Sequence, residues 1–222
     1  ENLRITLREE LAKADWLEDS TKQNALKKLN AFYPKIGYPE RFRDYAEVAI
    51  SSNAYFQNVR AASIAERQYE LAKIGKPLDR NDWGMTPPTV NAYYNPLQNE
   101  IAFPAGILQS PFFDLNADDA ANYGAIGAVI GHEMGHGFDD QGSKFAADGS
   151  LTNWWTDADR KRFDARAQCI IDEFNTLEVG GGLPNHNGKL VTGEALGDLG
   201  GVTLAFKAYQ RSLKGKPAPV ID

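Results

Sequence analysis

The chain has 222 residues, 42% of them hydrophobic and 11% aromatic, which is enough apolar material for a substantial globular core. Its 24 Lys and Arg stand against 30 Asp and Glu without forming a basic stripe, so we expect no nucleic-acid partner. The longest apolar stretch, residues 125–131, is far shorter than the roughly 20 residues of a membrane span, so we expect no span within this chain. One Cys and three His exclude a thiolate metal cage, so any metal site must use carboxylates.

The first third of the chain is predicted to be helical. Leucines recur every four residues over residues 3–11, and a second helical pattern, with its expected N-cap at residues 20–21, continues to Pro34. A longer helix is expected over about residues 44–74, closed by Gly75.

The middle of the chain changes in character. Residues 89–94 and 100–103 are short runs rich in β-branched and aromatic side chains, separated by turn-forming residues. They predict a small hairpin or edge-strand region. A second helical part then begins at Asn116, the expected N-cap of a helix that runs to Gly137.

Two more helices are predicted in the last third. Thr156 is the expected cap of a helix with one apolar stripe, formed by Phe163, Ala167, Ile170, Ile171 and Phe174. A glycine-rich loop over residues 180–188 leads to a last helix over about residues 192–213. Together, these patterns predict a mainly α fold with a small β-sheet.

The segment His132-Glu133-Met134-Gly135-His136 carries the clearest chemical signal. On a helix, positions four apart lie about 40° apart around the axis and one turn along it, so both imidazoles can face one metal ion. Glu133 is rotated by about 100° from His132 and can reach a water on that ion without binding it. Zinc peptidases have this arrangement. The alternative, two surface histidines, fits poorly with the apolar, glycine-rich surroundings of the motif.

A catalytic zinc ion takes three protein ligands and keeps a fourth position for water. His186 is one candidate for the third ligand, but it lies in a loop, and a solvated turn residue is the preferred interpretation. Glu194 is the better candidate because it opens the last helix, with Asp198 four residues on and on the same face. One carboxylate can bind the metal while the other accepts the free N–H of a ligand imidazole. We therefore expect one Zn²⁺ per chain.

Glycines interrupt both the helix that carries the two histidines and the last helix, which carries Glu194. They are Gly124, Gly127, Gly131 and Gly135 in the first and Gly197, Gly200 and Gly201 in the second. Each costs about 1 kcal/mol of helix stability relative to Ala. Their number indicates that the two backbones approach closely, as they must if both deliver ligands to one ion. A tightly packed helix pair without a metal is the alternative, but it does not explain why His and Glu fall on adjoining faces.

Several longer markers lie around the motif: residues 91–94, 103–109, 131–140, 154–155 and 193–201. With these markers the chain resembles, over nearly its whole length, the catalytic domain of the neprilysin-like family of zinc metallopeptidases. The resemblance implies a thermolysin-like zincin fold. We expect residues 1–80 to form a helical segment that leads into a zinc-binding catalytic domain, residues 81–222, truncated at its C-terminal end.

The resemblance also implies a function, a zinc metalloendopeptidase that hydrolyses short peptides. His132, His136 and Glu194 would bind the zinc, and Glu133 would be the general base that acts on the zinc-activated water. Asp198, which we count with Glu133 among the catalytic residues, would orient one ligand histidine, and Asp139 would orient the other.

The substrate-binding residues implied by the resemblance are Asn91, Ala92, Ile107, Phe112, Ala128 and Val129. Asn91 and the backbone of Ala92 would hydrogen-bond the substrate main chain, in agreement with an edge strand that adds a peptide strand. The others would line the pocket for the residue after the scissile bond. For Ile107 and Phe112, plain core packing is an equally good interpretation.

Two other functions stay open. The family's sequence continues beyond this stretch with a His that stabilises the oxyanion and an Arg that contacts substrate, and neither is present in these residues. An inactive zinc-binding fragment is therefore the alternative, with the remainder of its own polypeptide as partner. A helical interaction protein without metal is disfavoured, because the glycines would then weaken helices for no gain.

The compartment is not assigned by the sequence. Residue 1 is Glu and no leader follows, so any targeting signal or anchor is expected to lie outside these residues. Cys169 is interpreted as an unpaired thiol. The resemblance implies that relatives outside the cytoplasm pair a cysteine near this place, so the lack of a partner favours a bacterial member. An extracytoplasmic location, periplasmic or secreted, is favoured.

Overall fold

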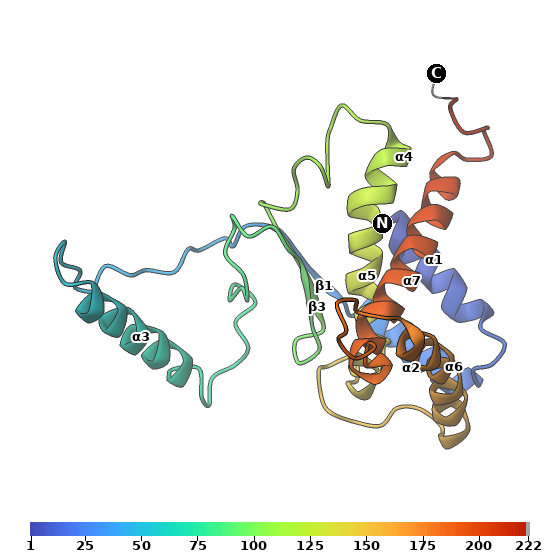
Figure 1. The fold of residues 1–222 in the computed structure, drawn as a ribbon, viewed down its shortest axis with the longest axis horizontal. Helices are drawn as coiled ribbons and strands as arrows, with labels where there is room; N and C mark the ends of the chain where they lie inside the picture. Colours follow the sequence, from blue (N-terminus) through green and yellow to red (C-terminus); the bar gives the residue numbers. More distant parts are fainter. Residues whose placement is uncertain (221–222) are drawn as a thin grey trace. The chain divides into compact units, whose positions relative to one another are not determined.

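The computed structural model describes residues 1–220, and Figure 1 shows the arrangement of the elements. In chain order they are α1 (Asn2–Lys13), α2 (Asp19–Asn30), β1 (Tyr33–Gly37), α3 (Tyr55–Leu71), β2 (Tyr93–Asn95), β3 (Glu100–Pro104), α4 (Asp119–Asn122), the π-helical turn η1 (Tyr123–Gly127), α5 (Ala128–His136), the 3₁₀ turn η2 (Gly142–Lys144), α6 (Asp157–Thr176) and α7 (Gly188–Ser212). The expected mainly α fold with a small sheet is confirmed.

The chain forms two compact units. Residues 39–84, which include α3, form one, and residues 1–38 together with the chain from Met85 onward form the other. This division differs from the boundary expected at residue 80, because α1, α2 and β1 lie in the unit that holds the zinc motif. In that unit α1 packs along α7, and ion pairs join Glu9 to Arg211 and Glu10 to Lys207. Residues 221 and 222 of the expected catalytic domain lie outside the described residues.

The sheet has three strands in the order β1-β3-β2. β2 and β3 form the expected antiparallel hairpin, and β1 pairs with β3 in parallel, with Tyr33 opposite Glu100. The sequence pattern predicts the end of a helix at Pro34 and gives no indication of β1. β3 is buried along its whole length, whereas β2 is an edge strand that contacts α5.

The predicted helices are present, but several of them begin at other residues than the sequence indicates. α2 is present, but Glu18 is its N-cap residue rather than residues 20–21, and the carboxylate of Asp159 accepts the backbone N–H of Glu18. Asp118 rather than Asn116 precedes α4. The long helix of the second unit begins at residue 55 and not near residue 44. Thr156 caps α6 as expected, its hydroxyl accepting the N–H of Asp159.

The core of the larger unit lies where the sheet, α2, α5 and α7 meet. Leu29, Phe32, Phe103, Met134 and Leu204 are buried in one apolar cluster there. The zinc motif therefore stands on a helix whose opposite side is anchored in the core, which is what a precisely oriented site requires.

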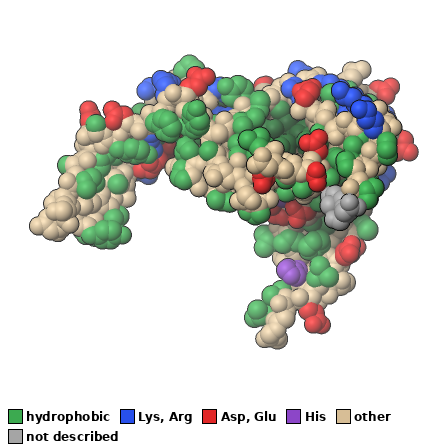
Figure 2. Space-filling view, turned by 90° about the horizontal axis from the view of Figure 1, so that it is seen from above, with side chains coloured by type: hydrophobic (Ala, Val, Ile, Leu, Met, Phe, Trp, Pro, Cys, Tyr) green, Lys and Arg blue, Asp and Glu red, His purple; other side chains and the backbone are tan. Residues whose placement is uncertain are grey.

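The surface is mixed in character. Apolar side chains lie among acidic and basic ones on the face shown in Figure 2. Among the described residues, no helix combines the length and the apolar character that crossing a bilayer would need.

Candidate metal centre

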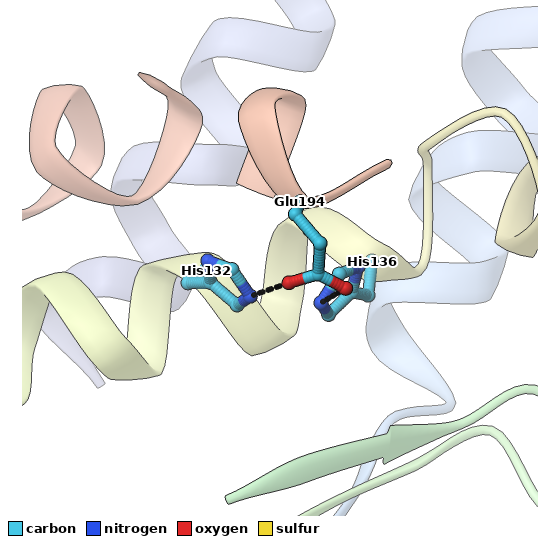
Figure 3. A group of neighbouring side chains, drawn as sticks. All are labelled: His132, His136 and Glu194. Atoms are coloured by element: carbon cyan, nitrogen blue, oxygen red, sulfur yellow. Dashed lines mark ion pairs between the residues drawn. The ribbon is translucent and has the colours of Figure 1, made fainter. Parts of the chain in front are cut away.

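Both histidines of the motif project from α5. His132 and His136 are half-buried, and their rings stand edge to face with centroids 4.4 Å apart. Figure 3 shows both rings turned toward Glu194, which comes from α7. The sequence-based expectation that two separate helices would present these three side chains to one point agrees with this geometry.

The distances within this group match a zinc site. His132 Nε2 lies 3.4 Å from Glu194 Oε2, and His136 Nε2 lies 3.8 Å from Glu194 Oε1. One donor atom from each residue falls within 4.8 Å of the others. Tetrahedral ligands about 2.1 Å from a zinc ion lie roughly 3.4 Å from one another. The residues present therefore fit a Zn²⁺ ion with small side-chain adjustments.

Two aspartates orient the imidazoles. His132 Nδ1 lies 2.8 Å from Asp198 Oδ1, and His136 Nδ1 lies 2.8 Å from Asp139 Oδ2. With a proton on Nδ1, each ring donates to its aspartate and leaves the lone pair of Nε2 for a metal. Asp198 is open to solvent, its side chain 81% exposed, whereas Asp139 is buried. Burial lowers the pKa of His136, but the hydrogen bond to Asp139 and the charges of Asp139, Glu133 and Glu194 together outweigh burial and raise it.

Glu133 lies on the buried side of the group. It is 6% exposed, and burial raises its pKa, while the charges of His136 and His132 act in the opposite direction. The backbone N–H of Tyr94, in β2, also acts to lower that pKa. Glu133 thus lies close to both histidines and to the edge strand. A carboxylate whose pKa is raised accepts a proton more readily, as a general base must.

The glycines allow α5 and α7 to touch (Figure 1). A Cβ on Gly131 would lie 2.8 Å from Cα of Gly201, and one on Gly197 would lie 2.8 Å from Nδ1 of His132. The close approach expected from the sequence is therefore confirmed at these positions. Gly124 and Gly200 have no atom within 4 Å of an added Cβ and are not required by it.

Neighbouring glycines on α7 offer a matched test of this contact. Gly201→Ala is expected to destabilise the protein by about 1–3 kcal/mol, because its Cβ would lie 2.5 Å from the carbonyl oxygen of Ala128. Gly200→Ala, one residue away, is expected to leave stability unchanged or raise it by up to about 1 kcal/mol, because Ala favours helix and meets open space. Denaturant unfolding measures both, and equal effects would contradict a close helix contact.

The residues predicted to bind substrate lie in different environments. Asn91 is exposed, and its side chain accepts the N–H of Ala92 at 2.9 Å, just before the edge strand β2. Ala92 and Ile107 belong to the apolar core, and Phe112 packs against it. Ala128 and Val129 are half-buried on the turn of α5 before His132. Their substrate roles stay predictions.

His186 lies apart from the metal group. It is exposed in the loop before α7, with its ring 6.4 Å from that of Phe174 and its backbone N–H bonded to Leu177. Its position agrees with the solvated turn residue that the sequence favoured.

Lys28 carries no signal in the sequence, yet it reaches the loop after α5. Its ammonium donates to the carbonyl oxygens of Gly142 and Phe145 at 2.6 and 2.7 Å. No sequence signal could have found this contact, since Lys28 sits on α2 among other charged residues and its burial is a property of the tertiary fold alone.

Comparison with known proteins agrees with the site. A model described as peptidase family M13 matches residues 91–222, and a second model of the same description matches residues 1–39. The chain is 41% identical over 218 residues to neprilysin-11 of Caenorhabditis elegans, covering 95% of this chain and 26% of that protein. It is 43% identical over 203 residues to a putative zinc metalloproteinase of Streptococcus gordonii, covering 90% of this chain and 36% of that protein.

The fold is also similar to those of solved structures. A crystal structure of the Mycobacterium tuberculosis zinc metalloprotease ZMP1 in complex with inhibitor has a TM-score of 0.96 and 51% identity, over 100% of this chain and 34% of that one. The crystal structure of PEPO from Lactobacillus rhamnosis has a TM-score of 0.86 and 34% identity, over 97% of this chain and 34% of that one. The chain thus spans 26% to 36% of the lengths of these relatives.

Proposed function

Because the chain belongs to peptidase family M13, we propose that it forms the zinc-binding part of a metalloendopeptidase that hydrolyses peptide bonds. The observation that carries this proposal is the convergence of His132, His136 and Glu194 within 4.8 Å, with Glu133 beside them. A bound Zn²⁺ would polarise the scissile carbonyl and lower the pKa of water.

In the proposed mechanism Glu133 takes a proton from the attacking water and passes it to the departing amine. Its burial favours this role, because a carboxylate whose pKa is raised is a stronger base and accepts a proton more readily than an exposed one. Asp198 and Asp139 keep the Nε2 atoms of the two histidines facing the ion. The side chain of Glu194 is 72% exposed, so the site has an open side from which water and peptide can approach.

The edge strand β2 gives the substrate a place to align. Asn91 and Ala92 precede β2, and the backbone N–H of Tyr94 within it lies close to Glu133. A peptide that extends the sheet at this edge would bring its backbone next to the general base. We propose short peptides as substrates, with Ile107, Phe112, Ala128 and Val129 near the side chain after the cut. We also propose an extracytoplasmic location.

Removal of the metal tests the proposal. A chelator is expected to abolish hydrolysis of a fluorogenic peptide and to lower the melting temperature by about 5–10 °C, because zinc in 100-fold excess over its dissociation constant adds about 2.7 kcal/mol to stability. Added zinc should restore both. Bound zinc without hydrolysis of any peptide in a panel would favour the inactive zinc-binding fragment instead, and a chelator without effect would contradict the zinc site.

A further inference from the structure

Lys28 is an almost completely buried lysine whose position the proposed mechanism does not explain. It is 1% exposed, and its ammonium lies 5.7–5.9 Å from the ring centroids of Tyr94, Phe138 and Trp154. Burial lowers its pKa to about 7, and the charge of Asp139 opposes that shift. Burying a lysine amine lowers the stability of the fold unless its N–H groups are hydrogen-bonded, so we ask which contacts compensate for its burial.

The carbonyl oxygens that Lys28 binds belong to the turn that holds Asp139. Gly142, which accepts from Lys28 at 2.6 Å, donates its own backbone N–H to Asp139 Oδ1 at 2.6 Å. The N–H of Gln141 donates to the same oxygen at 2.8 Å. The other oxygen of Asp139 accepts from Nδ1 of His136 at 2.8 Å. A continuous path of hydrogen bonds therefore runs from α2 to a zinc-binding imidazole.

The backbone of the 142–145 turn is closely packed and held at both ends. A Cβ on Gly142 would overlap the carbonyl oxygen of His136, so the turn lies directly against the end of α5. Lys28 donates to the first residue of η2 and to Phe145, the residue just after it, and so holds both ends of the turn. In either protonation state its nitrogen carries enough N–H groups for both bonds.

We propose that Lys28 is a positioning residue for the zinc site: by holding the 142–145 turn it fixes the carboxylate of Asp139, which in turn fixes the ring of His136. The inference rests on the proposed zinc site and assigns Lys28 no contact with zinc or substrate. Asp198 offers a contrast, because its carboxylate meets solvent directly. We therefore expect the orientation of the His136 ring to depend on the surrounding fold more strongly than the orientation of the His132 ring.

A double-mutant cycle tests this path on the intact, zinc-loaded protein. Lys28→Met keeps the aliphatic stem and removes the donor, and is expected to weaken zinc binding about three- to tenfold, measured by competition with a chromogenic chelator. Asp139→Asn is expected to weaken it about 10- to 100-fold. In the Asp139→Asn background, Lys28→Met should cause no further loss, because the path is already broken. The visible spectrum of the Co²⁺-loaded protein should change with Lys28→Met.

Two further variants separate positioning from general destabilisation. Lys35→Met with Glu100→Gln removes another buried lysine and its ion-pair partner, 2.8 Å apart in the sheet, and should leave zinc affinity within twofold. Lys28→Gln keeps an NH₂ donor on a shorter, uncharged side chain, and its zinc affinity should fall between those of wild type and Lys28→Met. If Lys28→Met fails to fold, Lys28→Gln takes its place in the cycle.

Unchanged zinc affinity in Lys28→Met would overturn the inference. So would a loss of zinc affinity from Lys28→Met that is as large in the Asp139→Asn background as in the wild type. A similar loss of zinc affinity in the Lys35→Met and Glu100→Gln control would overturn it as well. Zinc affinity is measured without peptide, so a protein that binds zinc and cleaves nothing refutes the proposed function and leaves this inference standing. A His136→Ala variant with normal zinc affinity refutes the zinc site itself.

Discussion

Glu133→Gln is expected to lower peptide hydrolysis by about a thousandfold while zinc stays bound. General acid–base catalysis by a positioned side chain contributes about 10²- to 10⁴-fold, and an amide cannot accept the proton of water. Glutamine has nearly the same shape as glutamate, so it can occupy the same buried place. The turnover number on a fluorogenic peptide measures the loss.

Zinc content is the accompanying measurement for Glu133→Gln. Elemental analysis should give one zinc per chain in both the variant and the wild type. Glu173→Gln, on the exposed side of α6, makes the same chemical change outside the metal group and should leave hydrolysis unchanged. Turnover retained in Glu133→Gln would refute its role as the general base, whereas loss of both zinc and turnover would place Glu133 among the residues that hold the metal.

Glu194→Ala is expected to remove the metal, with zinc affinity falling by more than about a hundredfold. Loss of a partner that only orients a ligand costs about 10- to 100-fold, and loss of a ligand itself costs more. Glu194 also contributes the negative charge that the two neutral imidazoles lack, so its removal weakens both bonding and charge compensation. Elemental analysis after dialysis measures the result.

His186→Ala is the matched control for Glu194→Ala, since His186 was the other candidate for the third ligand. It is exposed and lies apart from the group formed by His132, His136 and Glu194. It should retain full zinc content. Normal zinc content in Glu194→Ala would show that Glu194 is not a zinc ligand. Loss of zinc in His186→Ala would indicate that His186 is the third ligand instead.

The sequence predicted most reliably what depends on neighbouring residues. His132 and His136 face one point because four residues make roughly one helical turn, and that holds wherever the helix lies. Thr156 was recognised as a cap because its hydroxyl bonds an N–H three residues on. The glycine spacing indicated a close helix pair because glycine inside a helix carries a local cost that something else must offset.

Predictions were less accurate where distant contacts compete with local preference. Residues 20–21 looked like a cap, yet Thr21 lies inside α2, where its hydroxyl accepts the N–H of Thr156, and Asp159 bonds the true start of the helix. β1 exists only because β3 lies beside it, and five residues containing a proline carry no clear strand signal alone.

The sequence by itself predicted the metal-binding motif, the proposed general base, the helices that carry the candidate ligands and the glycines that let those helices meet. Only the tertiary structure decided that α7 places Glu194 within 3.4 Å of His132, that the edge strand places Tyr94 close to Glu133, and that Lys28 donates to the turn behind His136. The physical reason is one of range: helical periodicity and capping act over three or four residues, whereas these contacts join residues that only the packing of the core brings together.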